Sequence, residues 1–309
     1  MNARAPAAGA EPPKAFSMHR GDELHVECGR VNAVFDVKSG AITRLVTRGV
    51  RVFDSPAKGI PGGPQLTCAR AFTDNDKWLM DEFYNSGLSQ LHYHAEPILV
   101  VSNVVKTVVD VSGAKGCGFR HECDYVFPGD DTIEVVNRVT PYGEMPHLPR
   151  LGLTMRLYPR IGRMKYYGRG PWENYSDRCS ASFVGIWASR ADEQFVDYVR
   201  PQDNGCKCGV RWAEFADKYG NGVRFSASEP LVMQALHYGW EELAFSRPMR
   251  GMPRFRTPLT PRREIMLNLD VRQTGLGGAS CGPAPMEKYL FDAKAPVEWT
   301  MKIEPLRAM

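Results

Sequence analysis

A long series of short β-branched runs, each ended by turn residues, constrains the fold of this 309-residue chain more than any other feature. The series opens with residues 24–28, 31–37 and 42–46, and a Ser39-Gly40 turn precedes the last of these. It continues through residues 98–111, 132–139, 151–157, 209–215, 222–226, 264–271 and 297–303. Many short strands separated by Gly and Pro turns predict antiparallel sheets packed face to face.

Only two stretches have helical spacing, residues 74–91 and 240–245, and neither alternates with strands as βαβ units do. The sequence contains no internal repeat, and the Pro-rich residues 141–149 are typical of a loop. Residues 1–17 carry too few large apolar side chains to offset the entropy of ordering, so we expect a disordered leader or linker there. We expect residues 18–309 to form one large all-β sandwich.

The charge pattern argues against several classes of partner. The 39 basic and 35 acidic residues give a net charge of +4 and are interspersed, so nucleic acid is not an expected partner. No stretch approaches the ~18 apolar residues needed to cross a bilayer, and the first residues lack the apolar region of an export signal. We therefore expect no membrane partner and a cytoplasmic location.

The cysteines and histidines do not form a metal-site pattern. Eight cysteines are too sparse for a disulfide-built scaffold in a chain of this length, and we interpret them as free, buried thiols. Cys206 and Cys208 are spaced C-x-C without a second pair at zinc-site distance. His92 and His94 would share one strand face, but no carboxylate or Cys partner accompanies them. We therefore expect no metal in this chain.

The densest cluster of polar and aromatic residues is 166–178, which surrounds a Gly-x-Gly-Pro turn. Sugars present apolar C–H faces and a rim of hydroxyls, so a sugar site needs flat aromatic surfaces beside paired donors and acceptors. Glu173, Asn174, Asp177 and Arg178 supply such groups. The alternative interpretation is a turn in which these polar side chains hold the neighbouring backbone.

Two further segments are rich in turn residues. Residues 198–205 contain Asp203 and Asn204 but end in a strong turn signal, which favours a hairpin connection. The Gly-rich residues 275–283 follow a predicted strand and open no helix, so they do not fit a phosphate-binding loop.

Asp74, Asn75 and Asp76 place three oxygen-bearing side chains in a row just before the predicted helix. Such a group could bind a hard cation or cap the helix. Capping is the expected role of at least one of them.

The chain carries four motifs in order: R-A-x-x-D-N-D at 70–76, G-x-G-P-x-E-N-Y-x-D-R at 168–178, Y-V-x-P-x-x-N-G at 198–205 and L-N-L-D-x-x-Q-x-G-L-G-G at 267–278. In this order and spacing they resemble the last domain of family 2 β-galactosidases, which in some bacteria is a separate small chain. The resemblance spans about residues 18–305.

The resemblance implies a large antiparallel β-sandwich of the galactose mutarotase-like type. It also implies that hydrolysis uses two glutamates on a barrel that this chain lacks, so we expect no catalytic residue here. The implied partners are a β-galactoside and a β-galactosidase large chain or upstream barrel domain, in an oligomeric enzyme. Complete enzymes of the family often use Mg²⁺ and Na⁺, but no cofactor is expected in this chain.

The resemblance further implies that this domain supplies the rim of the carbohydrate or aglycone site. Family members continue the Gly-Gly stretch as D-D-S-W, whereas this chain has Cys281 there, and a thiol cannot stack on a sugar ring. Lys77 and Trp78 stand where the family has a Gly that hinges a mobile loop. These departures favour a substrate preference other than lactose. The residues expected at the rim are Asp74, Asn75, Asp76, Glu173, Asn174, Asp177, Arg178, Asp203, Asn204 and Cys281.

Two other functions stay open on the sequence. One is a stand-alone carbohydrate-binding module, for which a shared fold is weak support. The other is a mutarotase-like aldose epimerase, which needs a converging acid and base, usually Glu with His.

Overall fold

The computed structural model describes residues 15–57, 60–245 and 259–306, which form eighteen strands, two α-helices and three 3₁₀ turns. The first nine strands are β1 (Phe16–Arg20), β2 (Glu23–Cys28), β3 (Val31–Asp36), β4 (Ile42–Thr47), β5 (Val50–Asp54), β6 (Gln65–Thr67), β7 (His92–Ala95), β8 (Leu99–Val101) and β9 (Val104–Ser112). The others are β10 (Gly118–Val126), β11 (Ile133–Tyr142), β12 (Arg150–Leu157), β13 (Arg163–Gly170), β14 (Phe183–Arg190), β15 (Lys207–Ala216), β16 (Gly222–Leu236), β17 (Ile265–Gln273) and β18 (Val297–Pro305). The helices are α1 (Lys77–Ser86) and α2 (Trp240–Phe245), and the 3₁₀ turns are η1 (Asp74–Asp76), η2 (Ala191–Glu193) and η3 (Glu287–Tyr289).

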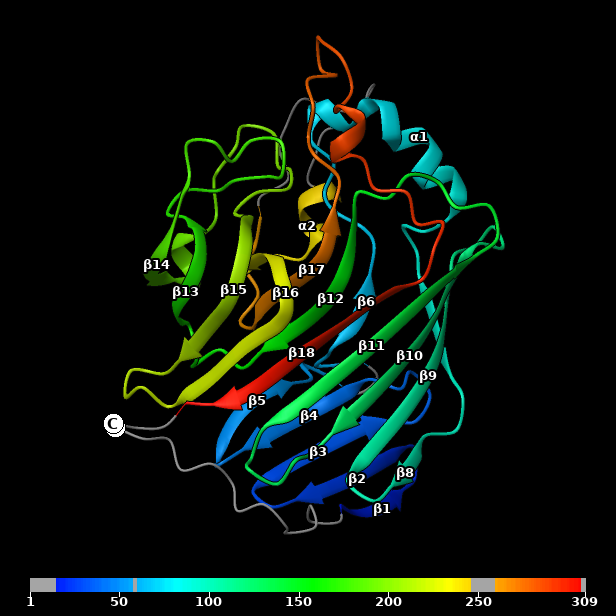
Figure 1. Ribbon diagram of the computed structural model, residues 1–309, viewed down its shortest axis with the longest axis vertical. Helices are drawn as coiled ribbons and strands as arrows, with labels where there is room; N and C mark the ends of the chain where they lie inside the picture. Colours follow the sequence, from blue (N-terminus) through cyan, green and yellow to red (C-terminus); the bar gives the residue numbers. More distant parts are fainter. Residues whose placement is uncertain (1–14, 58–59, 246–258, 307–309) are drawn as a thin grey trace.

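The strands pair antiparallel and join into a strongly curled sheet (Figure 1). β1 to β5 form a meander in which each strand pairs with the next. A second run of neighbours follows the order β9, β10, β11, β18, β16, β15, β13 and β14. β16 also pairs with β17, which leads through β12 to β6. The predicted all-β, antiparallel class is confirmed.

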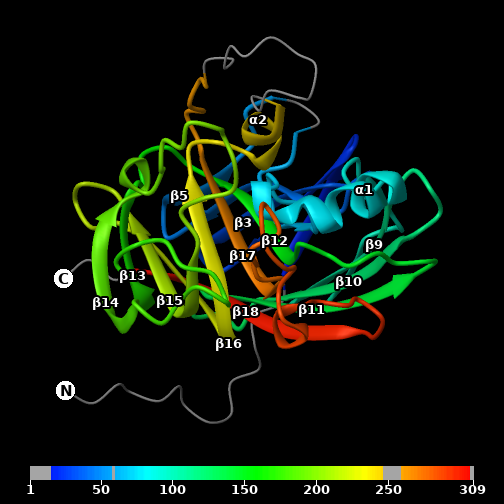
Figure 2. The ribbon, with the colours of Figure 1, turned by 90° about the horizontal axis from the view of Figure 1, so that it is seen from above.

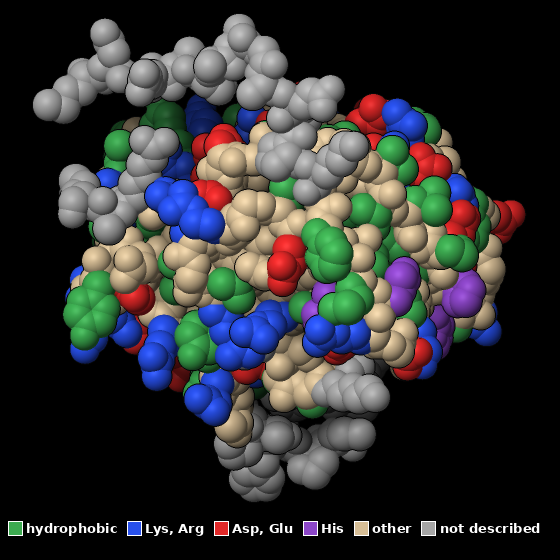
Figure 3. Space-filling model, turned by 90° about the horizontal axis from the view of Figure 1, so that it is seen from below, with side chains coloured by type: hydrophobic (Ala, Val, Ile, Leu, Met, Phe, Trp, Pro, Cys, Tyr) green, Lys and Arg blue, Asp and Glu red, His purple; other side chains and the backbone are tan. Residues whose placement is uncertain are grey.

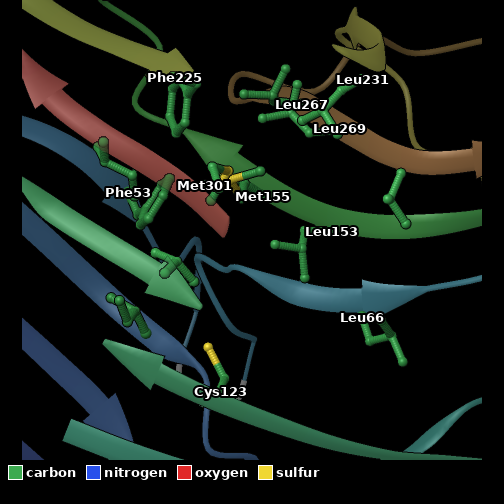
Figure 4. Packing of buried hydrophobic residues seen from close by; sticks show 14 of the residues in the cluster. Phe53, Leu66, Cys123, Leu153, Met155, Phe225, Leu231, Leu267, Leu269 and Met301 are labelled. Atoms are coloured by element: carbon green, nitrogen blue, oxygen red, sulfur yellow. The ribbon is translucent and has the colours of Figure 1, made fainter. Parts of the chain in front are cut away.

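The main hydrophobic core fills the space between the layers of this curled sheet (Figure 4). Leu66, Leu153 and Leu269 lie opposite one another on β6, β12 and β17, and all three are buried. Phe225 of β16 and Met301 of β18 pack on the same core. Burying one such side chain stabilises the fold by about 1.5–3 kcal/mol, so the alternation along each strand fixes which face points inward.

The two predicted helical stretches are confirmed, the first with shorter bounds and the second with the predicted bounds. The first divides into η1 and α1, and α1 buries Leu79 and Phe83 against the core. It ends at Gly87, which has a φ of 80° and closes the last turn through a hydrogen bond to Tyr84. The second stretch forms α2.

Two predicted segments have different local structure. Residues 98–111 form the hairpin of β8 and β9 in place of one long strand, because the chain reverses at Ser102, which has a φ of 55°. Residues 166–170, expected at a turn, are the second half of β13, and the turn begins at Pro171. Tyr166 is accordingly a core residue.

The sheet begins two residues before the predicted start of the domain at residue 18. β1 begins at Phe16, so Phe16 and Ser17 of the expected leader belong to the sheet, while residues 1–14 lie outside the described residues. The main core draws on residues from Leu24 to Ile303 and includes Leu148 from the Pro-rich stretch.

Among the described residues, no helix is both long and apolar enough to span a bilayer. On the face seen from below, Lys and Arg side chains are mixed with acidic and hydrophobic ones and do not form a basic stripe (Figure 3). The opposite end carries α1 and the loop of residues 274–290 side by side (Figures 1 and 2).

Candidate functional site

The four motif segments converge at the upper end of the molecule in Figure 1, around a pocket of about 210 Å³ that we call the upper pocket. Five of the ten expected site residues line it: Asn75, Glu173, Asn174, Arg178 and Asp203. The other lining residues are Thr73, Tyr175, Tyr198, Gln202 and Leu276. Tyr198 and Gln202 belong to a segment that the sequence singled out, although neither was named as a site residue.

Asp177 anchors the Gly-rich loop and does not line the upper pocket. Its carboxylate accepts hydrogen bonds from the backbone N–H groups of Leu276 (3.0 Å) and Gly277 (2.7 Å). Gly277 has a φ of 65°, a conformation that glycine adopts at little cost. Arg178 donates to the carbonyl of Gly277 from the other side, so two neighbouring charges hold this loop beside the pocket.

Asp76 is a structural residue that caps η1. Its Oδ2 accepts hydrogen bonds from the backbone N–H and the hydroxyl of Thr73, at 2.8 and 2.9 Å. Its Oδ1 accepts from Arg70, and both side chains of this ion pair are fully buried. Arg70 also donates to the carbonyl of Thr274 at 2.7 Å, which fixes the start of the Gly-rich loop.

Asp74 pairs with Arg200 at 3.3 Å, where Arg200 is largely exposed and Asp74 is partly exposed. Asn75 accepts a hydrogen bond from the backbone N–H of Ser280 at 3.2 Å. The contact brings the segment with the exposed Cys281 to the same end of the molecule, although Cys281 does not line the upper pocket.

Glu173 uses both carboxylate oxygens to join segments far apart in the sequence. One oxygen accepts a hydrogen bond from the hydroxyl of Tyr198, and the other accepts from the backbone N–H of Gly205 at 2.8 Å. Burial and the neighbouring carboxylate raise the pKa of Tyr198 to about 12, so its hydroxyl is a donor at neutral pH. Both carboxylate oxygens of Glu173 therefore already accept a hydrogen bond from the protein, and these bonds fix the position of the side chain.

Two of the three asparagines named from the sequence, Asn174 and Asn204, mainly hold backbone. Asn174 is buried, donates to the carbonyls of Arg169 and Trp172, and accepts from the N–H of Cys208 at 2.8 Å. Asn204 is also buried and accepts from the N–H of Val196 at 3.1 Å. For these two side chains, the turn interpretation describes the observed contacts.

Asp203 forms the floor of the upper pocket and belongs to a buried polar network. It accepts hydrogen bonds from the hydroxyl of Tyr175 and from Nε2 of Gln234, both at 2.9 Å. Arg150 lies 4.0 Å away and forms its main ion pair with Asp270, at 2.9 Å from Nε. Burial raises the pKa of Asp270 to about 6, although the Arg150 charge opposes this shift.

Arg150, Gln234 and Asp270 were not predicted from the sequence. Arg150 is the first residue of β12, and Gln234 and Asp270 stand beside apolar residues within β16 and β17. For Arg150 and Gln234, a polar residue beside apolar ones is the signal that could have drawn attention to them, since buried polar groups need partners. Asp270 belongs to the fourth motif but was not named as a site residue. The partners themselves lie 84 and 120 residues away from Arg150 in sequence.

The arrangement can bind a polar ligand but has few groups free for chemistry. The two lining carboxylates, Glu173 and Asp203, are engaged in hydrogen bonds that hold the fold. Arg178 and Gln202 line the opening as donors, and Tyr175 and Tyr198 supply ring surface. Within the described ranges, no cluster of three His, Cys, Asp or Glu side chains could hold a metal ion.

The fold and this loop-built pocket define a β-sandwich of the galactose mutarotase-like type. A galactose 1-epimerase structure from Lactobacillus acidophilus NCFM aligns with 96% of this chain and 98% of its own, with a TM-score of 0.52 and 9% sequence identity. That likeness concerns the fold alone.

The sequence places the chain more narrowly. Residues 27–303 match the family described as Beta galactosidase small chain, and the chain belongs to this family. It is 26% identical over 273 residues to a β-galactosidase of Actinobacillus pleuropneumoniae, covering 86% of this chain and 25% of the relative. The corresponding values for a β-galactosidase of Vibrio cholerae serotype O1 are 25% over 267 residues, covering 84% and 25%. The chain thus spans about a quarter of the length of the curated relatives it matches.

Proposed function

We propose that the chain is a component of a β-galactosidase that hydrolyses terminal β-D-galactosides and that it supplies the rim of the sugar site. The catalytic glutamates then lie on a separate large chain or an upstream barrel domain. The observation that carries this proposal is the convergence of Asn75, Asp177 and Arg178 on one loop beside the upper pocket. This geometry would hold residues 275–281 against a substrate bound by the partner.

The hydrogen bonds and burial of the carboxylates at the upper pocket favour a non-catalytic role for this chain. A retaining glycosidase needs two carboxyl groups about 5–5.5 Å apart, one of them free to attack the sugar. Glu173 is tied to Tyr198 and Gly205, and Asp203 is buried beneath the pocket. We propose that any Mg²⁺ or Na⁺ of the assembled enzyme binds to the partner.

An exposed apolar edge supports the presence of a partner. β14 pairs with β13 on one side, and Phe183 and Ile186 on it are 73% and 60% exposed. Trp172, also 73% exposed, stands two residues after Gly170, which lies opposite Phe183. Exposed apolar side chains on a strand with an unpaired side mark an interaction surface, and here they lie on both faces of β14, with Val184 and Ile186 on one and Phe183 on the other. We assign this β14 patch (Trp172, Phe183, Val184 and Ile186) to contact with the large chain.

The exposed Cys281 bears on which galactosides the enzyme prefers. A thiol offers no flat surface on which a second sugar can stack, so the rim would favour aglycones that need no stacking partner. We propose that aryl galactosides are turned over better than lactose. Measuring kcat/KM for both substrates on the reconstituted enzyme tests this, and equal values would contradict it.

The rim role is tested with the chain reconstituted with the large chain of its own organism. Arg178→Ala removes a pocket donor and a loop contact, so we expect a lower kcat/KM. Lys106→Ala, an exposed change on β9 where the side chain pairs with Asp124, is the matched control and should leave hydrolysis unchanged. Equal activity of the Arg178→Ala and wild-type enzymes would contradict a role of the upper pocket in the sugar site.

The two alternative functions need no partner: an aldose epimerase would be active alone, and a binding module would bind sugar alone. An aldose epimerase would need a converging acid and base, and no histidine is among the residues that line the upper pocket. Assaying the purified chain alone for galactose mutarotation separates this alternative from the proposal. Tight galactoside binding with no effect on a large chain would instead identify a stand-alone binding module.

A further inference from the structure

A row of uncharged polar side chains crosses the sheet on the face that points away from the main core. Gln65 of β6 lies opposite Thr154 of β12, and Thr154 lies opposite Asn268 of β17. The neighbouring row is Leu66, Leu153 and Leu269, which points into the core. Because successive residues of a strand point to opposite faces, the three polar side chains share the outer face.

This outer face is partly covered, and the cover encloses a pocket. α2 and residues 88–91 lie over it, and together with β6, β12 and β17 they surround a volume of about 330 Å³, which we call the sheet pocket. That volume is at the lower end of the roughly 300–1,000 Å³ typical of small-ligand sites. A sheet face covered by a helix is ordinarily apolar, since buried polar groups need hydrogen-bond partners.

The hydrogen-bonding direction of Asn268 is set by Gln234, its cross-strand neighbour on β16. Asp203 accepts from Nε2 of Gln234, so the Oε1 of Gln234 is an acceptor. Nδ2 of Asn268 donates to that Oε1 at 2.9 Å. The orientation leaves the Oδ1 of Asn268 as the acceptor for a ligand hydroxyl.

The remaining walls of the sheet pocket combine ring surface with two opposite charges. Trp240 and Tyr93 line it, as do Arg156 and Glu241. Burial lowers the pKa of Arg156 and raises the pKa of Glu241. Arg156 and Glu241, both among the described residues, do not form an ion pair with each other. The Nε of Arg156 is buried without a hydrogen-bond partner.

We infer that the sheet pocket binds a neutral monosaccharide. Amide and hydroxyl groups on its floor match sugar hydroxyls, the indole of Trp240 can pack on a C–H face, and the balanced charges disfavour a charged ligand. The site is separate from the upper pocket and from the proposed rim role. Its binding requires no large chain.

The test uses D-galactose as the probe, titrated into the purified chain and followed by backbone amide chemical shifts. We expect saturable binding to one site, with shift changes on β6, β12 and β17. Thr154→Val keeps the shape of the side chain but removes the hydroxyl, so affinity should fall by about tenfold. Thr154→Ser restores the hydroxyl and should recover most of the affinity, and Asn268→Leu should weaken binding further.

Lys106→Ala, an exposed change on β9, is the control and should leave galactose binding unchanged. Gln202→Ala tests whether galactose binds at the upper pocket instead. Thermal unfolding of each variant shows whether it remains folded. The inference is overturned if D-galactose does not bind the wild-type chain, if Thr154→Val binds as wild type does, or if only Gln202→Ala weakens binding. None of these outcomes depends on reconstituted hydrolysis, so the inference and the proposed function can fail separately.

Discussion

Gln234 donates a hydrogen bond to Asp203 across 2.9 Å, and this contact links the floors of the two pockets. On one side, Asp203 lines the upper pocket and accepts from Tyr175. On the other side, Gln234 accepts from Asn268, which lines the sheet pocket. A buried hydrogen-bond network therefore connects the upper pocket to strands β16 and β17.

Replacing Gln234 tests the importance of this network for stability. In Gln234→Met the side-chain volume is nearly kept, but Asp203, Asn268 and Arg150 each lose a hydrogen-bond partner. Leaving buried polar groups unsatisfied costs about 1–3 kcal/mol per group, so we expect the free energy of unfolding to fall by at least about 2 kcal/mol. Urea unfolding measures it. The control Gln202→Met, at the pocket surface, should change stability by less than about 0.5 kcal/mol.

The ion pair of Arg70 with Asp76 should contribute far more to stability than that of Arg200 with Asp74. Asp76→Asn leaves a fully buried Arg70 without its counter-charge, which costs about 3–5 kcal/mol. Asp74→Ala removes an exposed partner and should cost at most about 1 kcal/mol. Equal losses of the free energy of unfolding in the two variants would argue against the structural role of Asp76.

His121 should make stability depend on pH. It is buried beside Asn137, and burial lowers its pKa from 6.5 to about 4. Between these values the unfolded chain binds a proton that the native chain does not, so this contribution is complete above pH 6.5 and is lost as pH falls to about 4. The full loss is about 3 kcal/mol.

Asp270 acts in the opposite direction over the same range, because its native pKa is about 6, above its ordinary 3.8. Its contribution is present below pH 3.8 and is lost as pH rises through 6. The difference in free energy of unfolding between wild type and His121→Gln isolates the histidine. We expect that difference to shrink by about 3 kcal/mol from pH 7 to pH 4, whereas a constant difference would contradict the neutral, buried His121.

The β14 patch should be needed for assembly but not for folding. Phe183→Ser together with Ile186→Ser removes exposed side chains, so thermal unfolding of the chain alone should change little. Burying such side chains in an interface contributes about 1.5–3 kcal/mol each, so affinity for the large chain should fall at least about tenfold. Phe16→Ser on β1, 63% exposed, is the control. Unchanged affinity in the double variant would place the partner elsewhere.

The sequence predicted the fold class because strand and turn patterns are local. Runs such as residues 132–139 and 297–303 became β11 and β18 with bounds that differ by a few residues. The pattern could not reveal that these two strands, far apart in the chain, pair with each other. It also could not separate β8 from β9, because the reversal at Ser102 carries no Gly or Pro.

Motifs located the candidate site better than they assigned its residues. The segments around Asn75, Glu173 and Asp203 do meet at one pocket. Asp76 and Asp177 turn away from the pocket, to a buried arginine and to backbone N–H groups, and sequence type does not distinguish a carboxylate that binds ligand from one that holds a loop. Contacts over long sequence separations decide that difference.

Galactoside hydrolysis by the chain, by the large chain of the same organism, and by an equimolar mixture tests the central proposal most directly. An aryl β-D-galactoside is the substrate, and each chain is present at the same concentration in every sample that contains it. The proposal predicts no hydrolysis by this chain alone and a rate for the mixture well above that of the large chain alone. Equal rates with and without this chain, or hydrolysis by this chain alone, would contradict it.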